Sequence, residues 1–498
     1  MTVVNTNVAA LSAQSSMMKN TKEMENAMAK LSSGHRINNA SDDAAGLSIS
    51  ERLDSQIKGL SQAIRNSEDA QNLIDTAEGA HAEIVTSLQR LRELAVQSAN
   101  STNSAIDRSF IQKEASQLLN EINRISTTSE WNGMVLMDGS FDDKNIQAGA
   151  NVGQTIAIDL ASTETDEVGN FVIRGESKVT APAGVPAVNT IAAGNTIIAG
   201  FAGTQTITTA VNDTAREFAE DVNGVTEDTG VTAKAITRAI LQTLSAAGSV
   251  TLEIGKQGAV GTGEATVSTV TATVTDTTDL SALRDAINEV SGATGVVATS
   301  YQGDLSKILL TDDNGDDIQL QNFLHSASGT INYEAYNFHG DTKATGNTLE
   351  TLASGTTGDS ATIHGEVVLS SSKSFAITGT AQGEFFGGSG STTATFQSSL
   401  ESVGSVDLGT QIGAQKALLT IDGAIDHINN QRSDLGAISN RLDKTINNLT
   451  NVVENTTESL SHIRDANFAA ETSKLTKAQI LNQAATSMLA QANASKQT

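Results

Sequence analysis

The strongest pattern in the sequence is a seven-residue spacing of apolar side chains in its C-terminal part. One register contains Ile421, Ile428, Leu435, Leu442, Leu449 and, after a break at Thr456, Ile463. This spacing predicts a long coiled-coil helix. A second register of Ile425, Ile446, Val453 and Leu460 is interrupted by Arg432 and Ser439. We therefore expect this helix to pack against unlike helices and not in a symmetric dimer.

A partner for this helix is encoded near the other end of the chain. There, one heptad register is shared by Leu53, Leu60, Ile74, Leu88 and Ala95, beside a second of Ile57, Ile64 and Val85. Residues 107–125 form a shorter amphipathic pattern, with Ile111, Ala115, Leu118 and Ile122 on one face. The sequence thus predicts that segments far apart in the chain join in one helical bundle.

The extreme ends carry thinner apolar stripes. At the N-terminus the stripe consists of Val4, Val8 and Leu11, and at the C-terminus of Leu481, Ala485 and Met488. Such helices bury little surface alone, and isolated helices are marginal in water. We therefore expect both ends to be largely disordered in the monomer and to fold when neighbouring subunits cover them.

A hinge is predicted where the first helix meets the next. Gly34 is suited to the left-handed conformation that ends a helix, because it has no side chain. Ser41, with Asp42 and Asp43, is suited to cap the start of the following helix.

The middle of the chain has a different character. Both prolines, Pro182 and Pro186, mark its start, and it is rich in Gly, Thr, Ser and Val with short alternating runs such as 270–275. It also contains a repeat with an offset of 65. The first copy contains Phe218, Val222, Asn223, Val225, Gly230, Val231 and Ala233, and the second Leu283, Ile287, Asn288, Val290, Gly295, Val296 and Ala298. Each copy predicts a short helix, a turn and a strand.

These patterns together predict a multi-domain protein. Its terminal domains are all-α coiled coils, with a small β-hairpin region in the rod around the alternating residues 154–160, and its inserted outer domains are α+β and rich in strands. We expect an inner helical domain from 1–40 and 455–498. A rod domain follows from 41–178 and 405–454, and 179–404 forms the outer domains, expected as two α+β units.

Charge and composition narrow the possible functions. The 31 basic and 57 acidic residues give a net charge of −26, which would repel nucleic acid and anionic membrane surfaces. The absence of cysteine excludes a disulfide framework and a thiol nucleophile. Because the first charge is Lys19, the N-terminus lacks the basic start of a cleaved secretory signal, and no apolar run approaches the roughly 20 residues that span a bilayer.

Candidate chemistry is sparse. The seven histidines contain no pair spaced to share a helical face, and no HExxH motif is present. Residues 387–391, GGSGS, fail the pattern of a nucleophile elbow and are interpreted as a flexible loop. Residues 312–317, DDNGDD, begin like a calcium loop, but Phe323 stands where the bidentate Glu belongs. A hairpin turn at Asn314 and Gly315 is the expectation there, and a calcium site the alternative. We predict no catalytic residues, cofactor or metal.

Three long runs resemble the bacterial flagellins. They are 31–50 (LSSGHRINNASDDAAGLSIS), 89–103 (QRLRELAVQSANSTN) and 478–493 (AQILNQAATSMLAQAN). The resemblance implies a structural subunit that polymerises into a helical flagellar filament, with the inner domain lining the channel and the rod forming the wall. Many flagellins continue with a leucine-rich tail, whereas this sequence stops at Thr498, so its tail is short or the sequence is truncated.

The resemblance also implies partners. These are the flagellar export chaperone on the C-terminal segment, a filament cap, hook-associated junction proteins, and export through the flagellar secretion channel. Recognition of the monomer by Toll-like receptor 5 is carried over to Arg90, Leu94 and Glu114. Packing between subunits is the alternative role for these residues. A hook-filament junction protein and a surface adhesin with ligand-binding outer domains are the alternative functions.

Overall fold

The computed structural model describes residues 7–183, 191, 193–256, 266–344, 347–355, 358–379, 385–386 and 394–494. The chain divides into two compact units. The first unit contains Met1–Thr76, Asp142–Asp159 and Asp434–Thr498, and the second contains Ala77–Phe141 and Leu160–Ser433. Two long helices, α2 (Ala44–Ala99) and α9 (Gln411–Arg464), contribute residues to both.

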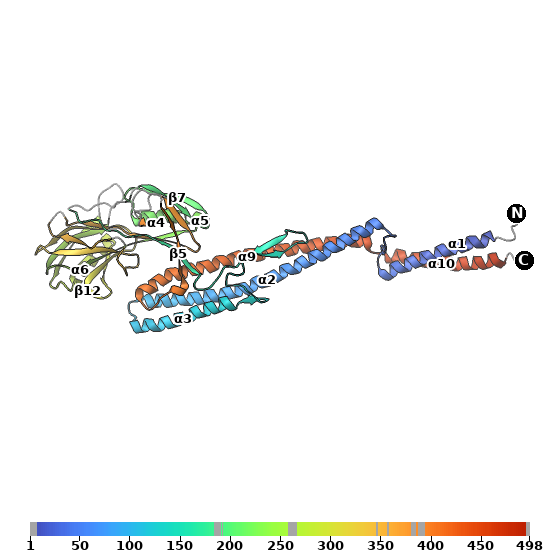
Figure 1. The fold of residues 1–498 in the computed structure, drawn as a ribbon, viewed down its shortest axis with the longest axis horizontal. Helices are drawn as coiled ribbons and strands as arrows, with labels where there is room; N and C mark the ends of the chain where they lie inside the picture. Colours follow the sequence, from blue (N-terminus) through green and yellow to red (C-terminus); the bar gives the residue numbers. More distant parts are fainter. Residues whose placement is uncertain are drawn as a thin grey trace. The chain divides into compact units, whose positions relative to one another are not determined.

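The first unit is mainly helical. Besides its parts of α2 and α9 it contains α1 (Val8–Ser33), α10 (Phe468–Ala494), β3 (Lys144–Gln147) and β4 (Thr155–Ile158). The helices α1 and α10 lie side by side, as Figure 1 shows at the two labelled ends of the chain. The strands β3 and β4 form an antiparallel hairpin, which confirms the strand expected at 154–160.

The predicted end of the first helix is confirmed at Gly34, where the backbone is left-handed with a φ of 72°. The long C-terminal helix α9 ends beside this turn. There Arg36 donates its amide to the carbonyl of Arg464, and Ala466 donates its amide to the carbonyl of Gly34. The helix α9 therefore continues beyond the expected domain boundary at 455 and ends at Arg464.

The capping of α2 differs from the expectation in one respect. The carboxylate of Asp43 accepts the amide of Gly46 at 2.8 Å and so caps the helix. Asp42 instead turns back, and its carboxylate accepts the amides of Asn38 and Asn39, both at 3.1 Å. The capping role given to Ser41 thus belongs to Asp43, because the helix begins immediately after it, at Ala44.

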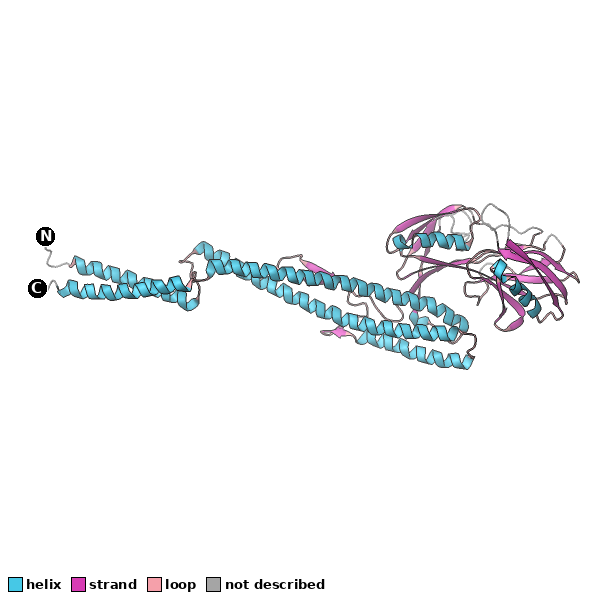
Figure 2. Cartoon of the chain, turned by 180° about the vertical axis from the view of Figure 1, so that it is seen from behind, coloured by secondary structure: helices cyan, strands magenta, loops and turns pink. Residues whose placement is uncertain are grey.

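The helical part of the second unit is a bundle of α2, α3 (Ala105–Thr128) and α9. Ser104 begins α3 with a capping box, in which its hydroxyl accepts the amide of Asp107 and the Asp107 carboxylate accepts the amide of Ser104. One buried cluster is built from all three helices, as predicted from the heptads. Figure 2 shows these helices lying alongside one another in cyan.

Strands and short helices make up the rest of the second unit. The strands are β1 (Glu130–Trp131), β2 (Met134–Val135), β5 (Gly169–Arg174), β6 (Gly194–Ala199), β7 (Thr204–Thr209), β8 (Thr232–Gln242), β9 (Gly248–Lys256), β10 (Thr266–Val274), β11 (Val297–Tyr301), β12 (Asp304–Asp312), β13 (Ile318–His325), β14 (Thr330–Tyr336), β15 (Glu350–Ala353), β16 (Ala361–Ile363), β17 (Glu366–Ser371), β18 (Ala376–Gly379), β19 (Ala394–Gln397) and β20 (Ser399–Ser402). The helices are α4 (Ala215–Gly224), α5 (Thr226–Thr229), α6 (Ser281–Glu289), α7 (Ser291–Thr294) and the 3-10 turn Val403–Ser405.

The strand β8 joins the two halves of this region. Its first half pairs with β17, and its second half lies between β12 and β14 in an eight-stranded sheet. A four-stranded sheet, β19-β18-β6-β7, and α4 contribute to one core, whereas the sheet β10-β9-β13-β16 and α6 contribute to another. The fold is therefore multi-domain, with helical terminal regions and a β-rich middle, as the sequence predicts.

The two copies of the sequence repeat adopt the same local structure. In each, two short helices end at a left-handed glycine, Gly230 or Gly295, and a strand follows. In the first copy the side chain of Asn223 donates to the Ala233 carbonyl and accepts the Ala233 amide. Asn288 makes the same pair of hydrogen bonds with Ala298. Each copy of the repeat therefore contains an asparagine whose hydrogen bonds join the helix to the strand.

Replacing Asn288 with alanine is expected to lower the free energy of unfolding by about 1–3 kcal/mol, because two backbone groups at a buried residue, Ala298, lose their partners. The matched change of Asn223, which is exposed, should cost less, since water replaces its hydrogen bonds. Chemical denaturation of the two variants measures both values. Equal losses would contradict the role of burial in this difference.

The turn between β12 and β13 corrects one expectation. A turn is present, because Gly315 has a φ of +83° and donates its amide to the Asp312 carbonyl. However, β12 pairs with β11 and β8, whereas β13 pairs with β9 and β16. The segment is therefore not a hairpin. It crosses from one sheet to the other, which sequence spacing alone does not distinguish.

Candidate assembly interface

The long heptad registers hold the monomer itself together. In the second unit Ile421, Ile428 and Leu88 are at most 1% exposed and belong to the cluster shared by α2, α3 and α9. In the first unit Leu60 and Leu449 lie in a second cluster. Leu435 and Leu442 are also buried, and Leu53 is half-buried. These side chains therefore stiffen the rods, and any part in subunit contacts stays a prediction.

Ion pairs also join α2 and α9 along their seam. Arg432, which interrupts the second register, places its guanidinium on Glu78 of α2, with its Nε 2.9 Å from Oε1. This hydrogen bond raises the pKa of Arg432. Arg92 and Asp422 form a comparable pair. Opposite charges on facing helices thus fix which helix packs against which, in agreement with the expectation of unlike partners.

The end helices leave most of their apolar side chains uncovered. Val8 is 70% exposed, Leu11 59% and Met488 65%. Leu481 is exposed and Ala485 half-buried, while Val4 lies outside the described residues. The residues that α1 and α10 bury fully are few, namely Ala27, Ala478 and the polar Glu471. Polar contacts join the pair as well, because the Asn482 amide donates to the Thr21 hydroxyl at 3.1 Å.

One face of α10 forms a shallow, open groove with both apolar and polar side chains. It is lined by Phe468, Ala469, Thr472, Ser473, Thr476, Lys477, Ile480 and Leu481. Phe468 is 71% exposed, which is unusual for an aromatic side chain. Exposed apolar surface of this kind on a helix marks a site of association with another chain. The groove and the stripe of α1 are the candidate interface of the first unit.

The residues carried over for receptor recognition do not share one surface. Arg90 and Glu114 form an exposed ion pair between α2 and α3, with Nη2 of Arg90 2.8 Å from Oε1 of Glu114. Leu94, by contrast, is 1% exposed, because it continues the apolar face that packs into the core of the bundle. While the bundle is intact, Leu94 cannot touch a receptor. It positions the helix that carries Arg90.

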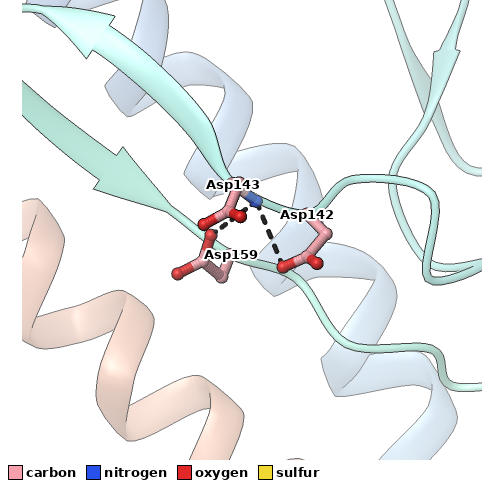
Figure 3. A group of neighbouring side chains, drawn as sticks. All are labelled: Asp142, Asp143 and Asp159. Carbon is pink, nitrogen blue, oxygen red and sulfur yellow. Dashed lines mark hydrogen bonds between the residues drawn. The ribbon is translucent and has the colours of Figure 1, made fainter.

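Three aspartates in the first unit lie close together, as Figure 3 shows. Asp142 and Asp143 precede β3, and Asp159 follows β4, so the hairpin brings their carboxylates within 4.8 Å of one another. The amide of Asp143 donates to Asp159 at 2.8 Å and to Asp142 at 3.1 Å. All three are exposed, and exposed carboxylates of this kind are common in turns without an ion. Sequence reasoning missed this group because it depends on strand pairing.

One carboxylate of the acidic turn at 312–317, that of Asp316, pairs with cationic side chains of the protein. The carboxylate of Asp316 accepts from Nε of Arg216 at 2.6 Å and from Nζ of Lys256 at 3.2 Å. Asp317 contacts His364 Nδ1 at 3.2 Å. Burial raises the pKa of Asp312. Because Arg216 and Lys256 already pair with Asp316, the geometry favours the structural interpretation of this turn.

Comparisons with known proteins agree with these observations. The model of the bacterial flagellin N-terminal helical region matches 4–142, that of the C-terminal helical region matches 418–498, and the flagellin hook IN motif matches 250–314. The B-type flagellin of Pseudomonas aeruginosa is 36% identical over 98% of this chain and 97% of its own length. The flagellin of Salmonella typhimurium is 34% identical over 99% and 97%.

A solved structure, the flagellar hook associated protein-3 from Legionella pneumophila, is more distant. It is 16% identical over 83% of this chain and 98% of its own, with a TM-score of 0.34. Across the described residues, no helix combines the length and the apolar character needed to cross a lipid bilayer.

Proposed function

This chain belongs to the bacterial flagellin family, and we propose on that premise that it polymerises through the exposed apolar side chains of its two end helices. Like the other members it is the structural subunit of the helical flagellar filament used for swimming. The family consists of structural proteins, which points away from an enzyme. The observation that carries the proposal is the exposure of Val8, Leu11 and Met488 on helices that bury little by themselves.

Assembly is favoured because neighbouring subunits cover this surface. Burial of apolar area contributes about 25 cal/mol per Å², and α1 and α10 bury mainly alanines between them. A head-to-tail contact that does not close on itself repeats indefinitely and generates a helical polymer. The inner domain of 1–40 and 455–498, which contains the end helices, then lines the channel. The rods of 41–178 and 405–454 form the wall. The residues 179–404 project outward.

The exposed apolar surface of the end helices also determines how the subunit is exported and added to the filament. A chain with exposed apolar end helices must be kept from premature polymerisation, so a cytoplasmic chaperone occupies the groove of α10. The chain leaves the cell unfolded through the flagellar secretion channel and is added beneath a capping protein. Hook-associated junction proteins receive the first subunits through the same end helices.

Recognition of the monomer by Toll-like receptor 5 would use the exposed pair Arg90 and Glu114. Both carry a hydrogen-bonding charge on a helical surface, which suits a protein partner. The buried Leu94 supports this surface from below. If the same surface packs against neighbouring subunits in the filament, the receptor reads it only in the free chain.

The decisive experiment compares the intact chain with a version that lacks α1 and α10. After seeding or the addition of a precipitating salt, electron microscopy should show long uniform tubes for the intact chain only. The shortened version should stay monomeric, because its apolar contacts are missing. A version that lacks 190–400 serves as the control and should still polymerise.

Two outcomes would overturn the proposal. Polymerisation of the shortened version would place the filament contacts elsewhere. Failure of the control lacking 190–400, with its helices intact by circular dichroism, would assign the contacts to the β-rich region and favour an adhesin-like role for it.

A further inference from the structure

A series of hydrogen bonds connects both long helices with the β-rich region inside the second unit. Nε2 of His81 on α2 lies 3.0 Å from Oε1 of Gln431 on α9. Nε2 of Gln431 lies 2.8 Å from Nε2 of His427, one turn earlier on α9. Nδ1 of His427 lies 3.1 Å from the carbonyl oxygen of Ser372, which follows β17. His81 is fully buried, and its Nδ1 has no hydrogen-bond partner among the described residues.

The donors and acceptors in this series of hydrogen bonds define one protonation state for the imidazoles of His81 and His427. Because an amide oxygen only accepts, Nε2 of His81 carries a proton and its Nδ1 does not. Because an amide nitrogen only donates, Nε2 of His427 is bare, and its Nδ1 carries the proton donated to Ser372. Both imidazoles are therefore neutral, in opposite tautomers. Gln431 is the link that makes each state depend on the other.

Burial favours the same neutral state, whereas the charges beside His81 oppose each other, because Glu78 raises and Arg432 lowers the pKa of His81. Glu78 of α2 and Arg432 of α9 form an ion pair beside His81, and Lys373 lies near His427. Burial is the largest cause for both rings and lowers the pKa of His81 and of His427. The hydrogen bond to the Ser372 carbonyl raises the pKa of His427, but burial outweighs it and Lys373 lowers the pKa further. The site thus resists protonation at the pH at which an ordinary histidine becomes charged.

We propose that His81, Gln431 and His427 form an acid-sensitive latch that fastens the segment after β17 to the helical bundle. When His427 gains a proton, its Nε2–H faces the Gln431 amide nitrogen, and two donors oppose each other. If Gln431 turns over, its amide nitrogen faces Nε2–H of His81 instead. That conflict is relieved only by moving the His81 proton to Nδ1, which is buried without an acceptor. Acid therefore opens the latch.

The direction of the pH dependence follows from the lowered pKa values. The open state binds more protons than the closed state, so the stability of the latch is fully present above the ordinary histidine pKa of about 6.5. It is lost as the pH falls from there toward the lowered pKa values of His427 and His81.

Nuclear magnetic resonance of the full chain, labelled with nitrogen-15 histidine, tests the latch directly. At about pH 7.5 the spectra should show His427 protonated on Nδ1 and His81 on Nε2, and both rings should titrate below about 6.5. Protection of the backbone amides at 371–373, corrected for intrinsic exchange, should fall by about tenfold or more at about pH 5.5. Equal tautomers, or titration of His427 at the ordinary value, would overturn the proposal.

A substitution that raises the pKa of His427 instead of lowering it distinguishes an acid-sensitive latch from a merely structural contact. Gln431→Glu offers acceptors to both rings, so it should raise the pKa of His427 and keep the amides at 371–373 protected at about pH 5.5. His462→Gln on the exposed part of α9 is the matched control and should leave the acid response unchanged. If Gln431→Glu loses protection in acid as the native chain does, the proposal fails. If that variant does not fold, the tautomers of the native chain still decide.

Discussion

Replacing Ile421 with alanine is expected to lower the free energy of unfolding of the helical bundle by about 2–5 kcal/mol. Ile421 is fully buried in the cluster that α2, α3 and α9 share, so the shorter side chain leaves a cavity. Denaturant titration followed by the helical signal of circular dichroism measures the loss. Val96→Ala on α2, whose side chain is 51% exposed, is the control and should change the stability by less than about 0.5 kcal/mol.

The same substitution should also reduce polymerisation. A filament subunit needs a stiff rod to present its ends at fixed positions, and a bundle that opens more often presents them less regularly. Seeded growth of the Ile421→Ala chain should therefore be slower than that of the Val96→Ala chain. Equal stability of the two variants would show that the heptad register does not build the core of the monomer.

Replacing Phe218 with alanine is expected to cost about 3–5 kcal/mol in the β-rich region, with the filament still forming. The ring of Phe218 is 1% exposed and lies 4.6 Å, between centroids, from that of Phe385. Leu283→Ala changes the equivalent position of the second copy, which is also fully buried, and should cost about 2–5 kcal/mol. Thermal unfolding and electron microscopy of both variants measure the two effects separately.

The two measurements answer different questions. Loss of stability with filaments retained would place 179–404 outside the contacts that drive assembly. Loss of filaments at a temperature where the helices remain folded would assign assembly contacts to this region, against the proposal. Unchanged stability would contradict the role of Phe218 as a core side chain.

Features that depend on neighbours along the chain were predictable. Heptads specify long helices because the period of an α-helix places every seventh residue near one face, and α9 accordingly spans Gln411–Arg464. Gly34 was recognised because only glycine adopts the left-handed backbone freely. The repeat was visible because both copies carry identical or similar residues at one offset, and each asparagine makes the same contacts.

Features that depend on which segments meet were not predictable in the same way. The turn at 312–317 has the residues of a hairpin, but its flanking strands join different sheets. Leu94 belongs to the residues that the resemblance assigns to receptor recognition, yet its side chain is buried in the core of the bundle. The aspartates at 142, 143 and 159 become neighbours only through the pairing of β3 with β4.

The sequence by itself thus determined the helices, their apolar faces, the repeat and the family, since each is recorded in local spacing or in contiguous runs. Only the tertiary structure decided the order of the strands, the burial of Leu94 and the alignment of His81 with Gln431 and His427. The physical reason is that a hydrogen bond or a buried contact between distant residues depends on the packing of whole elements, which no local pattern encodes.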